Sequence, residues 1–229
     1  MLIDPDNAPV EHLTETAKAA EAGGAAVILV GGSMLVNEAF DSVIRTIKTA
    51  SDIPVIIFPG NSRQLSKYAD GILFMSLLSG RNPQYLIGEQ VHAAPIIRRM
   101  DLPAVSTCYL LIESGKTTSA EFVSDTRPIP RNKSSIAVAH AQAAELFGFA
   151  TVYLEAGSGA EFPVPAEMIK AVAESVSVPV IVGGGITSAE QAVTAAKSGA
   201  AAVVVGTAIE RSGSSVIGEI AGSLKEITL

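Results

Sequence analysis

Short apolar runs rich in β-branched residues alternate with amphipathic segments along almost the whole chain. Most runs are continuously apolar, which is typical of parallel strands covered on both faces. Their alternation with helical patterns is typical of repeated βαβ units. Eight strands are predicted, at Leu2 to Asp4, Ala25 to Val30, Val55 to Phe58, Gly71 to Met75, Ala104 to Ile112, Thr151 to Glu155, Val178 to Val182 and Ala201 to Val205.

Helical patterns lie between most of these strands. The first begins at Pro9 and is followed by Gly23 and Gly24, the usual residues at the two boundaries of a helix. The third unit is weak, because only Ser62 to Lys67 is available for its helix. The predicted helices are Pro9 to Ala22, Asn37 to Ala50, Pro83 to Met100, Ser134 to Phe147, Pro165 to Ser175, Ser188 to Ser198 and Ser214 to Ile227.

These units predict a closed (β/α)8 TIM barrel that occupies residues 1–229 as one domain, somewhat below the ~250 residues typical of this fold. A doubly wound open sheet is the alternative, but the first turn lacks the Gly-rich pattern of that fold. The segment Glu113 to Lys133 is long and irregular, and such loops often serve as lids or binding loops. Whether Lys116 to Lys133 closes over a substrate is left open.

Composition and charge exclude several classes of protein. The chain is 48% apolar, but Gly, Pro or a charge interrupts every apolar run before the ~20 residues needed to cross a bilayer. We expect a globular, cytoplasmic protein. The net charge of −7 and the lack of a basic block disfavour nucleic acid as a partner. The single Cys108 is expected to be buried, and His12, His92 and His140 are expected to be surface or packing residues.

Two glycine-rich turns predict a phosphate site. The seventh strand is followed by Gly183, Gly184 and Gly185, and the eighth by Gly206 and Thr207. Glycines let backbone N–H groups approach a ligand, and a helix N-terminus adds partial positive charge. Barrel enzymes often bind phosphate after strands seven and eight. The alternative is that these glycines only make tight turns.

The sixth strand ends in Tyr153-Leu154-Glu155 and continues as Ala156-Gly157-Ser158-Gly159. Residues two apart on a strand share a face, so Tyr153 and Glu155 are both expected to face the barrel axis. Glu155 at the strand end is a candidate general base. A structural role, as an acceptor for loop N–H groups, is the alternative.

Oxygen donors follow the first two strands. Asp4 ends the first strand, and Ser33 follows Gly31 and Gly32 after the second. A carboxylate and a hydroxyl without a neighbouring His or Cys suit Mg²⁺ that holds a diphosphate. A turn and helix cap at Asp4-Pro5-Asp6 explains the same residues equally well.

Taken together, these motifs resemble the geranylgeranylglyceryl phosphate synthase family, which includes the bacterial PcrB-type heptaprenylglyceryl phosphate synthases. The resemblance extends over essentially the whole chain, and the strand-six motif is its most specific element. It rests on Leu2 to Asp6, Val30 to Ser33, Ser76 to Pro83, Tyr153 to Gly159, Val182 to Ile186 and Val205 to Thr207. One departure is Leu2, which stands where some members have a Lys.

The resemblance implies that the chain joins the C3 hydroxyl of sn-glycerol 1-phosphate to a long prenyl diphosphate and releases diphosphate. By position, Tyr153, Leu154, Glu155, Ala156, Gly157, Ser158, Gly159, Gly184, Gly185, Gly206 and Thr207 look like the glycerol-phosphate site, and Asp4 and Ser33 look like the Mg²⁺ site. Tyr153 and Glu155 are the candidate catalytic residues. The segments 156–159 and 116–133 look more like the archaeal-type and Bacteroidetes-type branch, which favours a C20 donor.

The apolar tail of such a donor requires a dry groove, and Phe58, Leu77, Leu78 and Tyr85 are candidates to line it. A homo-oligomer is expected, and transient contact with a membrane surface is left open. Two other functions remain: a phosphosugar barrel enzyme of amino-acid biosynthesis, which needs neither groove nor metal pair, and a noncatalytic barrel that binds a phosphorylated ligand.

Overall fold

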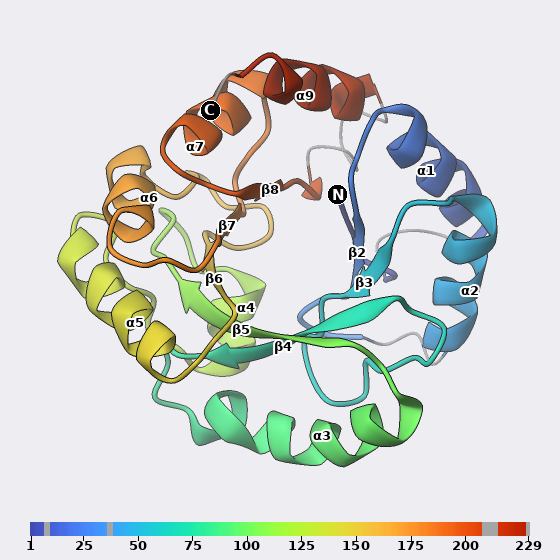
Figure 1. The fold of residues 1–229 in the computed structure, drawn as a ribbon, viewed down its shortest axis with the longest axis horizontal. Coiled ribbons are helices and arrows are strands. Elements are labelled where there is room, and N and C mark those ends of the chain that lie inside the picture. The colour runs from blue at the N-terminus through green and yellow to red at the C-terminus, as the bar shows by residue number, and fades with distance from the viewer. Residues whose placement is uncertain (7–9, 36–38, 208–214, 228–229) are drawn as a thin grey trace.

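Eight parallel strands form one sheet that closes into a barrel in the computed structural model (Figure 1). The strands follow one another in chain order from β1 to β8. The Leu2 N–H donates a 2.8 Å hydrogen bond to the Val205 carbonyl, which joins the last strand to the first. The predicted barrel is therefore confirmed, because a doubly wound sheet would reverse its strand order. The structure describes residues 1–6, 10–35, 39–207 and 215–227.

The strands lie where the apolar runs predict them, and no strand end differs from its predicted position by more than three residues. The second strand is shorter than predicted because only its last three residues pair with β3. The fourth is longer, since its pairing with β5 continues to Leu77. The strands are β1 (Leu2–Ile3), β2 (Ile28–Val30), β3 (Val55–Ile57), β4 (Gly71–Leu77), β5 (Ala104–Leu111), β6 (Thr151–Glu155), β7 (Val180–Gly183) and β8 (Ala202–Val204).

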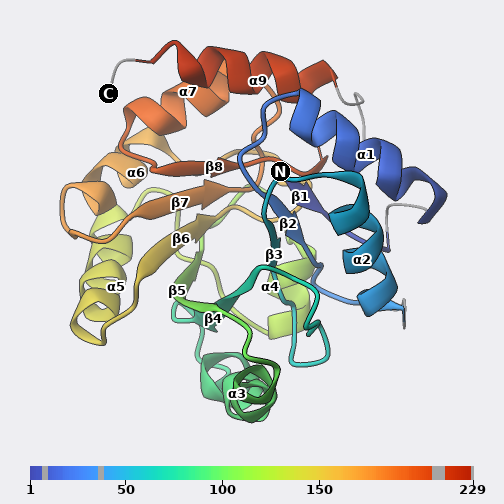
Figure 2. The same cartoon turned by 45° about the vertical axis from the view of Figure 1, so that its right-hand side comes forward.

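Helices surround the barrel on its outer side (Figures 1 and 2). The predicted helix over 83–100 is divided, because a π-helical turn precedes its regular part. The predicted starts at Pro9, Asn37 and Ser214 lie outside the described residues. The helices are α1 (Val10–Ala22), α2 (Phe40–Ala50), η1 (Gln84–Gly88), α3 (Glu89–Met100), α4 (Ser119–Ser124), α5 (Ser134–Leu146), α6 (Ala166–Ala173), α7 (Ala189–Lys197) and α9 (Ser215–Lys225). None of these helices is long and apolar enough to cross a membrane.

The third unit departs from the prediction. Residues 58–70, all of which the structure describes, contain no helix, so the expected helix at Ser62 to Lys67 is wrong. Hydrogen bonds to other parts of the chain hold this segment instead. The fully buried Gln64 side chain donates to the Gly32 carbonyl (2.7 Å), and the Ser62 N–H donates to the Glu89 carboxylate. The ring of helices consequently has only this loop between α2 and α3 (Figure 1).

The sequence predicts that the segment Glu113 to Lys133 is irregular. The structure differs, because the segment contains the short helix α4. Thr118 caps this helix, and its hydroxyl accepts a hydrogen bond from the Glu121 N–H. The Thr-x-x-Glu pattern is a helix-start signal that the sequence does carry. In both views α4 lies inside the ring of outer helices (Figures 1 and 2).

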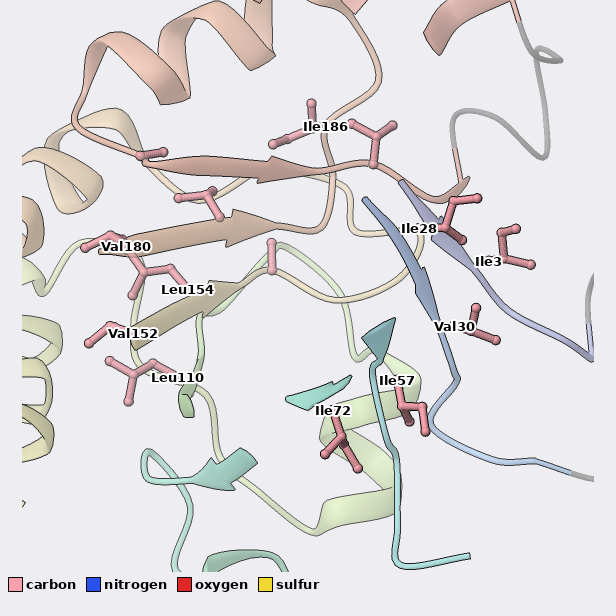
Figure 3. Packing of buried hydrophobic residues seen from close by; sticks show 14 of the residues in the cluster. Ile3, Ile28, Val30, Ile57, Ile72, Leu110, Val152, Leu154, Val180 and Ile186 are labelled. Carbon is pink, nitrogen blue, oxygen red and sulfur yellow. The ribbon is translucent and has the colours of Figure 1, made fainter. Parts of the chain in front are cut away.

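Two apolar layers stabilise the barrel. The larger lies between the strands and the outer helices, and Figure 3 shows paired residues of neighbouring strands in it, such as Leu110 with Leu154 and Val152 with Val180. Cys108 belongs to this layer and is fully buried, as predicted. The smaller layer contains Tyr153 and packs against Phe58 and Tyr109. Because side chains alternate along a strand, Leu154 and Tyr153 enter different layers.

Candidate active site

A polar pocket lies where the carboxyl ends of the strands meet. It combines residues from the loops after β1, β2, β6, β7 and β8, as the barrel requires. The pocket contains all but two of the predicted site residues, since Leu154 and Ala156 are buried in the outer apolar layer. Its lining includes Leu2, Asp4, Gly31, Gly32, Ser33, Phe58, Tyr109, Ala120, Tyr153, Glu155, Gly157, Ser158, Gly159, Ala160, Gly184, Gly185, Ile186, Thr187, Val204, Gly206 and Thr207.

Glu155 is a buried carboxyl group at the end of β6. Its side chain is 5% exposed, and Oε1 accepts a 2.6 Å hydrogen bond from the Gly157 N–H. Burial raises the pKa of Glu155 to about 7, and the hydrogen bond from Gly157 opposes this increase only in part. A carboxyl group with a pKa near neutrality can accept a proton from a bound hydroxyl. Both roles considered from the sequence, loop acceptor and base, are compatible with this geometry.

Tyr153 lies below Glu155 on the same face of β6. Its side chain is fully buried, and its pKa is raised well above 10 by burial, with a further contribution from the Glu155 charge. The phenol therefore stays protonated at neutral pH. Its hydroxyl is near the Glu155 carboxylate but makes no hydrogen bond of good geometry with any described residue. A buried donor without a partner at the pocket floor is suited to bind an oxygen of a ligand.

The glycine turn after β7 lies directly against Glu155. Gly184 has φ +80°, and a Cβ atom there would lie 2.3 Å from Glu155 Oε1 and 2.5 Å from the Gly157 nitrogen. Only glycine therefore allows the loops after β6 and β7 to approach this closely. The loop after β6 also contacts the loop after β8, because the Gly159 N–H donates to Thr207 Oγ1 (3.3 Å) and the Ser158 hydroxyl lies 3.2 Å from the same atom.

Asp4 and Ser33 also line this pocket, together with Gly32. A Cβ atom at Gly32 would lie 2.8 Å from both carboxylate oxygens of Asp4, so glycine leaves room at this carboxylate. Burial raises the pKa of Asp4, with an opposing hydrogen bond from the Asp6 N–H at 3.1 Å. A bound cation would counter this effect of burial.

An apolar groove extends from the polar pocket towards residues 58–70, where the ring of helices has a loop in place of a helix. It lies between the β3–β4 loop, β4, the start of α3 and α4. Phe58, Leu77 and Tyr85 line it as predicted, whereas Leu78 does not, because its side chain packs against the outer apolar layer. The other apolar lining residues are Pro59, Leu65, Ile72, Leu73, Phe74, Met75, Ala93, Tyr109, Ala120 and Val123.

The groove and the polar pocket are continuous. Gly32, Ser33, Phe58, Tyr109 and Ala120 belong to the lining of both. The Phe58 ring lies 6.0 Å from Tyr109 and 5.4 Å from the Tyr153 ring, so aromatic side chains form the floor where the two spaces meet. A ligand with a charged head and a long apolar tail fits this arrangement, since one end requires polar contacts and the other a dry surface.

Comparisons with known proteins agree with this geometry. The model of the PcrB family matches residues 1–224. The chain belongs to the PcrB family. It is 48% identical to geranylgeranylglyceryl phosphate synthase of Korarchaeum cryptofilum over 210 residues, which is 92% of this chain and 86% of that protein. It is 42% identical to the synthase of that name from Chitinophaga pinensis over 224 residues, 98% of this chain and 88% of that protein.

A solved structure is also similar over nearly the whole chain. The (S)-3-O-geranylgeranylglyceryl phosphate synthase of Thermoplasma acidophilum, in complex with its substrate sn-glycerol-1-phosphate, has a TM-score of 0.94 and 39% identity. The alignment covers 99% of this chain and 92% of that one. The family resemblance predicted from the sequence motifs is confirmed, and the activity predicted from them is the one for which these PcrB-family relatives are named.

Sequence reasoning missed residues that complete this PcrB-family site. Ala120 of α4 lines both the pocket and the groove. Thr118, which caps α4, packs against Gly157, and its Cγ2 atom lies 2.4 Å from the position that a Cβ atom at Gly157 would occupy. Gln64 holds Gly32 in place by accepting from its N–H (3.3 Å) and donating to its carbonyl. The Thr-x-x-Glu pattern could have indicated α4, but a single Gln in a polar loop carries no sequence signal.

None of the three histidines lines the polar pocket or the apolar groove. His12 and His92 are exposed on α1 and α3, and His140 bonds to the Ile136 carbonyl within α5. Over the described residues, no group of three or more His, Cys, Asp or Glu side chains forms a ligand set for a metal ion. A cation at Asp4 would therefore need further ligands from substrate or water, as is usual for Mg²⁺.

Proposed function

We propose that the chain joins the C3 hydroxyl of sn-glycerol 1-phosphate to C1 of geranylgeranyl diphosphate, forming an ether bond and releasing diphosphate. One observation supports this proposal. The polar pocket, which contains the buried carboxyl group of Glu155, is continuous with an apolar groove. The names of the relatives support the acceptor and the C20 donor.

Glycerol phosphate would bind with its phosphate at the loops after β6, β7 and β8. Backbone N–H groups of Gly184, Gly185 and Gly206, together with the Thr207 hydroxyl, offer donors for its oxygens. This would place the glycerol hydroxyls near Glu155 and Tyr153, which line the same pocket. The acceptor would then carry a phosphate at one end and a reacting hydroxyl at the other.

Glu155 would take the proton of the C3 hydroxyl as that oxygen attacks C1 of the donor. The bond between C1 and the diphosphate oxygen breaks, and its electron pair leaves with the diphosphate. Tyr153 would donate a hydrogen bond to a glycerol oxygen and orient it, since the phenol stays protonated. The aromatic floor made by Phe58 and Tyr109 would face the allylic carbon, where positive charge develops as the bond breaks.

Asp4 and Ser33 are the residues that would hold Mg²⁺. Their carboxylate and hydroxyl oxygens are the ligands this ion prefers, and Gly32 leaves space beside the carboxylate. The bound ion would neutralise the charge of the leaving diphosphate. Ser33 lines both the pocket and the groove, and Asp4 lines the pocket, so a diphosphate between head and tail would be placed beside them.

The prenyl chain would lie in the apolar groove, where Leu77, Met75 and Tyr85 exclude water. Burial of apolar surface contributes roughly 0.8 kcal/mol per methylene group, so a long chain supplies much of the binding energy. A homo-oligomer is part of this proposal, since Ile87 and Val91 on η1 and α3 are exposed apolar residues one helical turn apart.

The deciding experiment is turnover of radiolabelled sn-glycerol 1-phosphate with geranylgeranyl diphosphate and Mg²⁺. Parallel samples contain the sn-3 enantiomer or EDTA. We expect a prenyl ether from the sn-1 form alone, and no product with EDTA. Turnover in EDTA would remove the metal from the proposal. Binding of glycerol phosphate without product from any prenyl donor would favour the noncatalytic barrel instead.

A further inference from the structure

The charged residues that line the described part of the polar pocket are Asp4 and Glu155, and both are acidic. The proposed substrates carry a phosphate and a diphosphate, so the lining alone would repel them. Backbone N–H groups supply partial charges only. None of the described lining residues supplies a full positive charge at the glycerol-phosphate end, and a cationic side chain beside the pocket could supply it.

Lys116 is placed to supply this charge. Its Nζ lies 3.9 Å from the position that a Cβ atom at Gly159 would occupy, and no other atom outside the adjoining residues lies within 4 Å of that position. Gly159 lines the pocket and hydrogen-bonds to Thr207. The ammonium group thus lies over the loop that joins the predicted phosphate-binding residues.

The backbone on both sides of Lys116 is held against this loop. Before it, the Phe162 N–H donates to the Ser114 carbonyl at 3.1 Å. After it, the buried Thr118 packs against Gly157. The Lys116 side chain itself is exposed and forms no ion pair with any described residue. A fixed backbone with an unpaired, flexible cation can reach a ligand by rotation of side-chain bonds alone.

We propose that Lys116 binds the phosphate of the glycerol phosphate, with its ammonium group donating to a phosphate oxygen across Gly159. This inference rests on the proposed function and adds to it a substrate-binding side chain from the β5–α5 segment. It also gives that segment a role: Lys116 would contact the phosphate across Gly159, while Ala120 lines both the polar pocket and the groove.

The test compares Lys116→Gln and Lys116→Arg with Lys197→Gln, which removes the same charge from the last turn of α7, at the opposite end of the barrel. The Kd for sn-glycerol 1-phosphate is measured by calorimetry, and the KM for each substrate by turnover. Lys116→Gln is expected to raise the Kd and KM for sn-glycerol 1-phosphate roughly tenfold, the loss of one charge-assisted hydrogen bond. Its kcat and its KM for the prenyl donor should stay within about twofold of wild type.

Two further readouts separate binding from a structural effect. Lys116→Arg should restore the Kd to within about threefold, because it keeps the charge. Added salt should weaken binding to the wild type more than to Lys116→Gln. If Lys116→Gln binds sn-glycerol 1-phosphate as tightly as Lys197→Gln does, or if only the KM for the donor changes, the inference is wrong while the proposed function stands. If the wild type neither binds nor converts sn-glycerol 1-phosphate, the proposed function itself fails.

Discussion

The carboxylate of Glu155 accepts a 2.6 Å hydrogen bond from the N–H of Gly157, two residues further along the chain. This bond ties the proposed base to the loop proposed to bind the acceptor substrate. It occupies Oε1, while Oε2 lies on the side of Gly183, 3.1 Å from where a Cβ there would be. Oε1 therefore holds the loop after β6, and Oε2 is directed towards Gly183 at the end of β7.

Glu155→Gln should separate these two roles. The amide oxygen can still accept from Gly157, but the side chain cannot take a proton. We expect kcat to fall by roughly 10²- to 10⁴-fold, as for other lost general bases. The Kd for sn-glycerol 1-phosphate should change by less than about threefold, since the loop keeps its hydrogen bond. Calorimetry and single-turnover assays check both, and unchanged kcat would exclude Glu155 as the base.

The pH dependence of catalysis should follow the raised pKa of Glu155. The base must be ionised in the free enzyme, so kcat/KM for sn-glycerol 1-phosphate is expected to rise with pH through about 7 and to level off above it. Below that value the logarithm of kcat/KM should fall with a slope near one. The second ionisation of the substrate phosphate, at pH ~6, is separated by measuring Kd across the same range. A kcat/KM that is constant between pH 5 and 8 would contradict this assignment.

Gly184→Ala tests the close approach of the loops. The added methyl group would meet Glu155 Oε1 at 2.3 Å, in a backbone conformation that L-residues rarely adopt. We expect a loss of about 1–3 kcal/mol in the free energy of unfolding and a weaker affinity for sn-glycerol 1-phosphate. Denaturant titration and calorimetry measure the two effects. Gly218→Ala inside α9 is the control, because its added Cβ meets nothing within 4 Å beyond its own helix and adjoining residues, so it should raise rather than lower the free energy of unfolding.

Tyr85→Ala tests the assignment of the groove. Removing this ring enlarges the space between η1 and β4, so the ratio of turnover with a C35 donor to that with a C20 donor should rise roughly tenfold. Competition between the two donors in one reaction measures this ratio directly. Tyr68→Ala, on the outer surface beside Arg45, removes a ring without altering the groove. Equal ratios in both variants would show that the tail lies elsewhere.

Much of the polar pocket could be predicted because it depends on strand ends. Parallel strands in a barrel bring their carboxyl ends to one face, so Asp4, Ser33, Glu155 and Thr207 meet although they are far apart in the chain. The period of two along a strand likewise placed Tyr153 and Glu155 on one side. These relationships are local, or follow from the fold class alone.

The sequence by itself determined the barrel, the strand-end residues and the family. The tertiary structure decided what covers and extends the site: the loop held by Gln64 in place of a third helix, the position of α4, the groove that this gap leaves, and the approach of Lys116 to Gly159. Each of these is a contact between segments distant in the chain, and depends on side-chain packing that has no period and no fixed spacing. Strand periodicity can be predicted from neighbouring residues, whereas such contacts exist only when the barrel has closed.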